Sequence, residues 1–142
     1  MELDFALLCD AAQVTQGKTY ILGAGVTILW RQQYPSPLAV SLALQFTYHR
    51  TEADTDHQLR IQVIDADGNQ VFPEIGAEMR VGGPAPGVPP NVPLAAPFAF
   101  AFPPLPVLQR PGNYSVEILL DGRHLKSLPF VVAHPPEGML QQ

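Results

Sequence analysis

The chain has 142 residues, 46% of them hydrophobic and 15% charged, a composition typical of one folded domain and not of a disordered chain. Its 16 prolines and 11 glycines argue against a helix bundle, because a proline inside a helix removes a hydrogen-bond donor and clashes with the preceding turn. With 8 Lys and Arg against 13 Asp and Glu, the net charge is −5, and the cations are scattered. Binding of nucleic acid through its phosphates is therefore not expected, nor is adsorption to an anionic membrane.

Cysteine content and the first residues bear on the compartment. The single cysteine, Cys9, cannot form an intramolecular disulfide, and Met1 to Asp4 contain no cationic leader. No window reaches about 18 uninterrupted apolar residues, so no membrane span is predicted. We therefore expect cytoplasmic residence, and a chain of this size needs no cofactor or metal for stability.

Alternation of apolar and polar residues is the dominant pattern and predicts β-strands. It begins at residues 3–9, where Leu3, Phe5, Leu7 and Cys9 share one face, and it is clearest at residues 40–48. It returns at residues 59–63 and 114–120. Residues 19–31 are apolar on both faces, so we expect one long strand there, bent at Gly23 and Gly25.

Turn residues predict how these strands connect. Gln16-Gly17-Lys18, Asp65 to Asn69 and Asp121-Gly122 are typical hairpin turns, so consecutive strands should be mostly antiparallel neighbours. Residues 82–93 are rich in proline and glycine, which indicates an extended, polyproline-like surface loop.

The segment after this loop alternates phenylalanine with alanine. Phe98, Phe100 and Phe102 can all point one way from a strand, and the small alanines opposite them would let another element pack closely. Aromatic residues at this spacing usually fill the interior of a sandwich, which is the favoured interpretation. The alternative is an apolar patch at a sheet edge.

Together these elements predict an all-β fold: an antiparallel two-sheet β-sandwich, immunoglobulin-like, with seven to eight strands, or less favourably a small closed barrel. Tyr114 stands at the start of a late strand, where such domains use a tyrosine to hold a corner by bonding to backbone. Residues 1–134 should form the single domain, and residues 135–142 a flexible tail.

The N-terminal residues also carry a resemblance to a family. Leu3 to Ala12, followed by Gly17-Lys18 and the segment 22–25, resembles the opening of an uncharacterised family of short bacterial proteins, a domain of unknown function. The Pro111-to-Tyr114 strand entry and the Asp121-Gly122 hairpin match its later part. The resemblance implies a bacterial origin and an immunoglobulin-like β-sandwich, and it supplies no catalytic residues.

Two segments resemble ligand sites weakly. Asp65, Asp67 and Asn69 have the first spacings of a calcium loop, but Gln70 stands where that loop needs glycine, and a hairpin turn explains them without metal. The segment His49 to His57 contains two histidines and three carboxylates and could bind zinc, or it could be a solvated loop. Looser calcium binding by several loops is also left open.

No catalytic arrangement is evident. No serine lies in a Gly-x-Ser-x-Gly motif, Gly23-Ala24-Gly25 lacks the third glycine of a dinucleotide loop, and Cys9 is expected on the core face as a poor nucleophile. We therefore predict a non-catalytic protein that binds a protein partner or associates with itself. Alternatives are an accessory subunit of a larger bacterial assembly, or an enzyme whose site is built from loops. The candidate interaction surface comprises Phe98, Phe100, Phe102, Val88, Pro89 and Pro90.

Overall fold

The computed structural model describes residues 1–139, in which every regular element except one short 3-10 helix is a strand. The last part of the predicted tail, residues 140–142, lies outside the described residues. The elements in chain order are β1 (Glu2–Cys9), β2 (Ala11–Thr15), β3 (Lys18–Leu22), β4 (Ile28–Trp30), β5 (Ser41–Tyr48), η1 (Arg50–Glu52), β6 (Asp56–Asp65), β7 (Ile75–Arg80), β8 (Leu94–Ala101), β9 (Gly112–Leu120) and β10 (Arg123–Ala133).

The all-β prediction is confirmed, but the strands in the described part of the chain are ten and not seven or eight, and they form three sheets and not two. The sheets have the orders β1-β5-β8, β4-β10-β9-β6-β7 and β2-β3. The count rises because residues 19–31 are not one bent strand. Gly23, at φ +66°, ends β3 beside Asp10, whose amide donates to the carbonyls of Leu22 and Gly23, and the chain starts again as β4.

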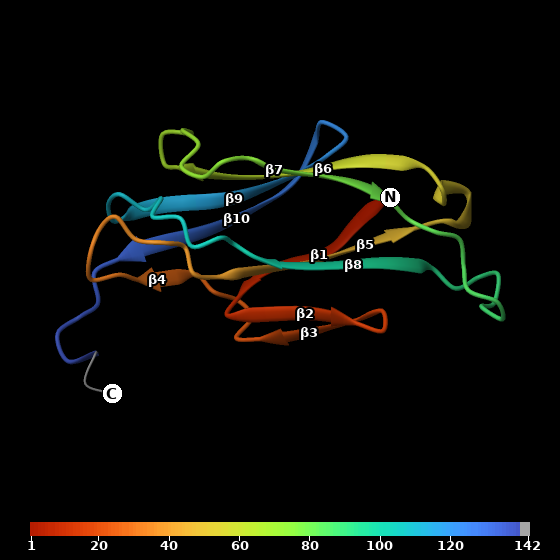
Figure 1. The fold of residues 1–142 in the computed structure, drawn as a ribbon, viewed down its shortest axis with the longest axis horizontal. Helices are drawn as coiled ribbons and strands as arrows, with labels where there is room; N and C mark the ends of the chain where they lie inside the picture. Colours follow the sequence, from red (N-terminus) through yellow and green to blue (C-terminus); the bar gives the residue numbers. More distant parts are fainter. Residues whose placement is uncertain (140–142) are drawn as a thin grey trace.

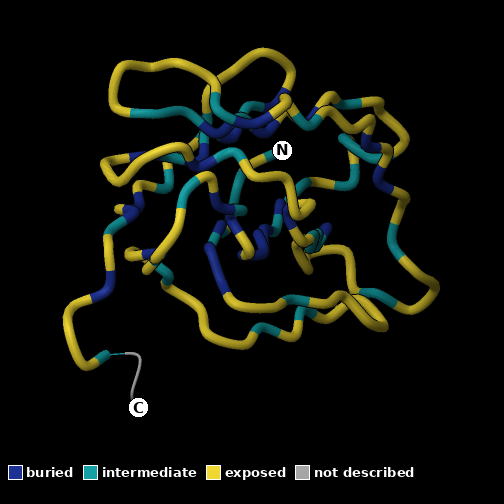
Figure 2. The backbone as a smooth tube through the Cα atoms, turned by 60° about the vertical axis from the view of Figure 1, so that its left-hand side comes forward, coloured by how far each residue is buried: buried dark blue, intermediate teal, exposed yellow. Residues whose placement is uncertain are grey.

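One hydrophobic core lies between the two larger sheets. It joins Leu42, Leu44 and Phe46 of β5 to residues such as Ile61 of β6 and Ile118 of β9. Every pairing in these sheets is antiparallel except that of β4 with β10, which is parallel. Figure 2 shows the buried residues gathered in the interior and the exposed ones along the outer loops.

The β2-β3 hairpin forms a third layer. Strand β2 lies beside β5 and β8, and Figure 1 shows the hairpin on the side of β1, β5 and β8 that is opposite to β6, β7, β9 and β10. Ala43 points away from the main core and is nevertheless 0% exposed, and Ser41 on the same face is buried as well. The small residues of this face therefore admit a closely packed element, as the Phe and Ala alternation predicted for β8.

A register shift between Leu3 and Phe5 changes which residues of β1 face the main core. Beyond it, Ala6 and Leu8 belong to the core cluster, whereas Cys9 is buried on the other face, next to Ser41. The expectation that Leu3, Phe5, Leu7 and Cys9 share one face was therefore wrong. A bulge moves every later side chain to the opposite face, and the spacing of apolar residues does not reveal it.

The C-terminal strands follow the predicted pattern. The Asp121-Gly122 turn joins β9 to β10, and both of its residues have positive φ. Of the predicted tail, Pro135 is buried, and Pro136 and Glu137 are exposed. Within residues 1–139, no helix has the length and apolar character needed to cross a membrane.

Candidate functional site

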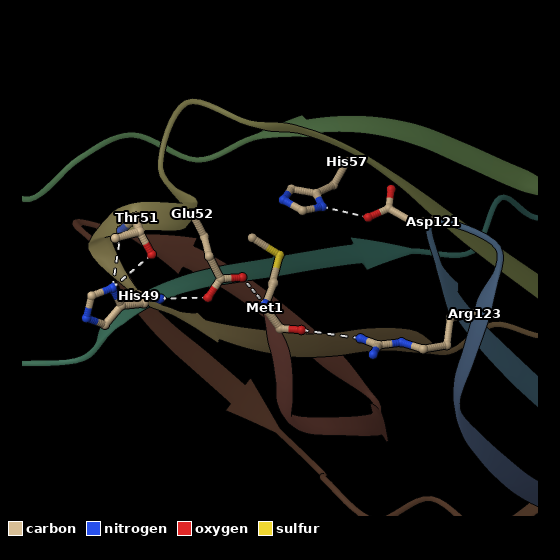
Figure 3. A network of polar contacts seen from close by, with 7 residues as sticks. All are labelled: Met1, His49, Thr51, Glu52, His57, Asp121 and Arg123. Atoms are coloured by element: carbon tan, nitrogen blue, oxygen red, sulfur yellow. Dashed lines mark hydrogen bonds and ion pairs between the residues drawn. The ribbon is translucent and has the colours of Figure 1, made fainter.

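A cleft of about 380 Å³ opens where the end of β5 meets the loop before β8 and the start of the chain. It is lined by Met1, Glu2, residues 47–50, Glu52 and residues 90–93. The fold thus brings together two segments that the sequence singled out separately, the loop of residues 82–93 and the segment His49 to His57. Figure 3 shows the polar network at this end of the molecule.

Arg50 fastens the proline-rich loop to η1. Its Nη2 donates to the carbonyl oxygens of Val88 at 3.0 Å and Pro89 at 2.8 Å. Val88 is half-buried, whereas Pro89 and Pro90 are exposed, and Val92 beside them is 43% exposed. The loop therefore exposes apolar side chains while its backbone is held by the Arg50 side chain.

The loop is not the extended polyproline segment that its composition predicted. The Val88 amide donates to Ala85 and the Val92 amide to Pro89, so residues 85–88 and 89–92 form two consecutive turns. In the first turn Pro86 precedes Gly87, whose φ is +89°; a type II turn requires this positive φ at its third residue and favours proline at its second. Proline at the second position of a turn fixes φ without extending the chain.

The first residues of the His49 segment form a compact cap. The His49 ring accepts from the Thr51 amide, and the His49 amide donates to Glu52 Oε1 at 3.0 Å. The Met1 amino group is paired with the other oxygen of Glu52. The pKa of Glu52 is held below its usual value, chiefly by the hydrogen bond from the Met1 ammonium and next by that from the His49 amide.

The remaining members of that segment are engaged separately. His57 Nδ1 lies 2.7 Å from Asp121 Oδ2 in the β9-β10 turn, and Asp56 pairs with Arg80 of β7 at 3.3 Å. The Gln58 amide and the His57 ring together hold the pKa of Asp121 below its usual value. Among residues 1–139, no three His, Cys, Asp or Glu side chains lie close enough to share a metal ion.

Tyr48 closes the cleft on the β5 side. Its hydroxyl donates to the Gly82 carbonyl at 2.8 Å, which holds the first residue of the loop. Burial, and to a smaller extent the carboxylate of Asp54, raises the pKa of Tyr48. The hydroxyl therefore keeps its proton and remains a donor at neutral pH.

The three phenylalanines of the candidate surface face the main core. Phe102 is 4% exposed and makes edge contacts with Phe72 and Phe100, at ring-centroid distances of 5.5 and 5.2 Å. Phe98 and Phe100 are half-buried against the same core. Val88 is half-buried and Pro89 and Pro90 are exposed on the loop before β8, so the candidate surface divides into a packed part and an exposed part.

The weak calcium-loop pattern is a hairpin turn. Asp65 Oδ1 accepts from the amides of Asp67 and Asn69, both at 2.9 Å, and the Asp65 amide donates to the Asn69 carbonyl. The Asn69 amide, with that of Asp67, lowers the pKa of Asp65. One carboxylate oxygen is therefore used to shape the turn.

A polar cluster that sequence reasoning missed lies on the exposed face of β9 and β10. His124 Nε2 is 2.6 Å from Glu117 Oε2 and 3.2 Å from Ser127 Oγ, and Ser127 also contacts Glu117. The serine and the carboxylate both contact Nε2 of the ring. In a catalytic triad the nucleophile contacts one imidazole nitrogen and the orienting acid the other, so this cluster does not have that arrangement. Burial alone would raise the pKa of Glu117, but bonds from Ser127, His124 and Ser115 outweigh it and lower it.

The cluster depends on a bulge in β10. The Asp121-Gly122 turn pairs Leu120 with Arg123, and a regular register would then place Lys126 opposite Glu117. A shift between His124 and Lys126 places Ser127 there instead. The hairpin was predictable from the sequence, but the extra residue was not.

Comparisons with known proteins found a matching family model and a similar solved structure. The model of a family described as "Family of unknown function (DUF6941)" matches residues 4–133. An immunoglobulin-like protein from Pseudomonas aeruginosa is similar in structure, with 17% identity, a TM-score of 0.41, and coverage of 93% of this chain and 95% of that one. No curated protein matches the sequence.

Proposed function

The chain belongs to the DUF6941 family of unknown function, and from that premise we propose that it is a non-catalytic interaction module that binds a protein partner. The binding surface is the end of the molecule formed by the cleft and by the exposed residues Pro89, Pro90 and Val92. The bond from Arg50 to the Val88 and Pro89 carbonyls carries the proposal, because it holds an apolar loop in place before any partner arrives. Such preorganisation lowers the entropy lost on binding.

The arrangement of strands supports an immunoglobulin-like sandwich as the scaffold. In such domains one sheet contains strands A, B and E and the other contains G, F and C, with C′ added in variable-type domains. The order β1-β5-β8 fits A-B-E, and β10-β9-β6-β7 fits G-F-C-C′. In this scheme the β2-β3 hairpin is an insertion after the first strand, and the corner bond of Tyr114 lies at the start of strand F.

The cleft itself supports binding in preference to catalysis. Two of its polar side chains bond to neighbouring parts of the chain: Glu52 to Met1 and His49, and Tyr48 to Gly82. A catalytic acid, base or nucleophile must instead be free to reach a substrate. The apolar wall formed by Pro90, Val92 and Pro93 is available to contact a partner, because these side chains make no hydrogen bonds within the chain.

The test is site-specific cross-linking. A photo-reactive amino acid replaces Val92 in one variant and Lys126, an exposed residue of β10, in another, in cells that naturally contain the protein. We expect one defined protein adduct from position 92 and none from position 126. Arg50→Ala in the position-92 variant should abolish the adduct while circular dichroism stays unchanged, and Arg60→Ala should not.

Two results would contradict the proposal. Equal adducts from positions 92 and 126 would mean that cross-linking reports random collisions. An adduct whose yield is unchanged by Arg50→Ala would mean that the anchored loop is not what the partner recognises.

We propose the cytoplasm as the compartment, consistent with a single unpaired cysteine that is buried.

A further inference from the structure

The outer edge of β7 differs from the other sheet edges in the described part of the chain. Sheet edges expose unpaired backbone groups, and proteins usually protect them with proline, bulges, lysine, covering elements or very short strands. Here β8 contains Pro97, β1 has a register shift, β4 has three residues, β3 carries Lys18 and β2 lies against β5 and β8. Strand β7 has six residues, no proline and a regular register with β6.

From this edge we propose that two copies of the chain dimerise by pairing their β7 strands antiparallel around Met79, which extends the five-stranded sheet across the dimer. A two-fold axis at Met79 places Glu78 of each copy opposite Arg80 of the other. Both side chains lie on the exposed face of the sheet. Opposite charges directly across an antiparallel pair stabilise it, and each dimer contains this pair twice.

The other face of the strand is compatible with the same register. Met79 is buried in the main core, and Val81, which is also buried, would lie opposite Ala77 of the second copy. The apolar faces of the two sandwiches would thus continue into each other. Because side chains alternate between faces, moving the axis to Glu78 or to Arg80 would place two like charges opposite each other. The sequence of β7 therefore selects the Met79 register over its two nearest competitors.

A hollow beside the edge provides room for the incoming arginine. A cleft of about 410 Å³ on the exposed face is lined by Arg60, Glu74, Gly76 and Glu78, among others. Arg80 of the second copy would lie diagonal to Gly76, which has no side chain to fill that space. The guanidinium would then lie near the carboxylates of Glu74 and Glu78, whose two negative charges outnumber the one positive charge of Arg60 in the same hollow.

Sedimentation velocity over a concentration series tests the proposal. We expect the purified wild-type protein to shift from monomer to dimer with rising concentration. Glu78→Arg and Arg80→Glu should each weaken dimerisation by at least about tenfold, because each replaces two attractive pairs with two repulsive ones. An equimolar mixture of the two variants should recover a heterodimer, and the double variant Glu78→Arg/Arg80→Glu should recover a homodimer.

The controls separate assembly from folding. Glu78 and Arg80 are exposed, and Arg80→Glu loses only an exposed ion pair with Asp56, so both variants should keep the wild-type circular dichroism with at most a small change in the unfolding midpoint. Lys126→Glu, a charge reversal on β10 away from this edge, should leave dimerisation unchanged. A wild-type protein that is monomeric up to about 0.5 mM overturns the proposal, and so does a mixture no more dimeric than the single variants. Cross-linking at position 92 reports a different surface and is unaffected by either outcome.

Discussion

The hydroxyl of Tyr114 donates a hydrogen bond to the backbone carbonyl of Arg110, 2.6 Å away and four residues earlier. Tyr114 is itself buried, and its ring stacks on Phe130 of β10 with centroids 5.6 Å apart. Burial raises the pKa of this tyrosine, which keeps the hydroxyl protonated as a donor. The bond fixes the chain at the point where it enters β9, and it confirms the corner that the sequence predicted.

Tyr114→Phe should lower the free energy of unfolding by about 1–2 kcal/mol, because it removes the corner bond and leaves the Arg110 carbonyl without this donor. The ring and its stacking on Phe130 remain, so the fold should persist. Urea unfolding followed by circular dichroism measures the effect. Tyr20→Phe is the matched control, since Tyr20 is 58% exposed, and it should be close to neutral. Equal stability of the two variants would show that the corner bond contributes nothing.

Much of the fold was predictable because strands such as β6 and β9 bury every second residue. Alternation located the segments that became β1, β5, β6 and β9, and Asp-Gly placed the β9-β10 turn. Errors arose where one residue changes the register. The bulge after Leu3 exchanged the two faces of β1, and the break at Gly23 turned one expected strand into the end of a hairpin and the start of β4.

The candidate site was predictable only as separate segments. Composition identified both the proline-rich loop and the polar His49 segment, but nothing in their spacing indicates that Arg50 would donate to Val88 and Pro89. That contact joins residues 38 and 39 positions apart, and it follows from tertiary packing of β5 against β8. Likewise, the pairing of His57 with Asp121 joins positions that only the β6-β9 register brings together.

Phe102→Ala should destabilise the protein by about 3–5 kcal/mol, the usual cost of removing a buried phenylalanine ring. The ring is 4% exposed and contacts both Phe72 and Phe100, so its loss leaves a cavity that the neighbouring rings cannot fill completely. Chemical denaturation gives the stability, and Leu105→Ala, at a residue 40% exposed, provides the comparison. A cost below that of Leu105→Ala would mean that the phenylalanine face is not core.

Asp121→Asn should reduce the loss of stability in acid. The pKa of Asp121 is lowered in the folded state, chiefly by the hydrogen bond from the Gln58 amide and next by that from His57. The ionised carboxylate therefore stabilises the folded protein relative to the unfolded chain. That contribution is complete above the ordinary value of 3.8 and disappears as the pH falls through the lower folded value. Urea unfolding between about pH 5 and pH 2 should give a shallower decline for Asp121→Asn than for wild type.

The same experiment has a control in the chain. Asp67, an exposed residue of the Asp65 turn, takes the same substitution without touching the β9-β10 turn. Asp67→Asn should therefore follow the wild-type pH dependence more closely than Asp121→Asn does. If Asp121→Asn and wild type decline in parallel, the bonds from Gln58 and His57 do not favour the carboxylate.

Ala43→Leu should loosen the β2-β3 hairpin and expose Cys9. Ala43 is 0% exposed on the face that the hairpin covers, so three extra carbon atoms must displace the hairpin or strain the sheet. In the wild type, burial and secondarily Asp10 raise the pKa of the Cys9 thiol, and its Sγ donates to the Ser41 carbonyl, so thiol reagents should react slowly without denaturant. The rate of thiol labelling should rise at least about tenfold in Ala43→Leu. Ala95→Leu, at an exposed position of β8 on the same face, should leave it unchanged, and equal rates in all three proteins would mean that the hairpin does not protect this layer.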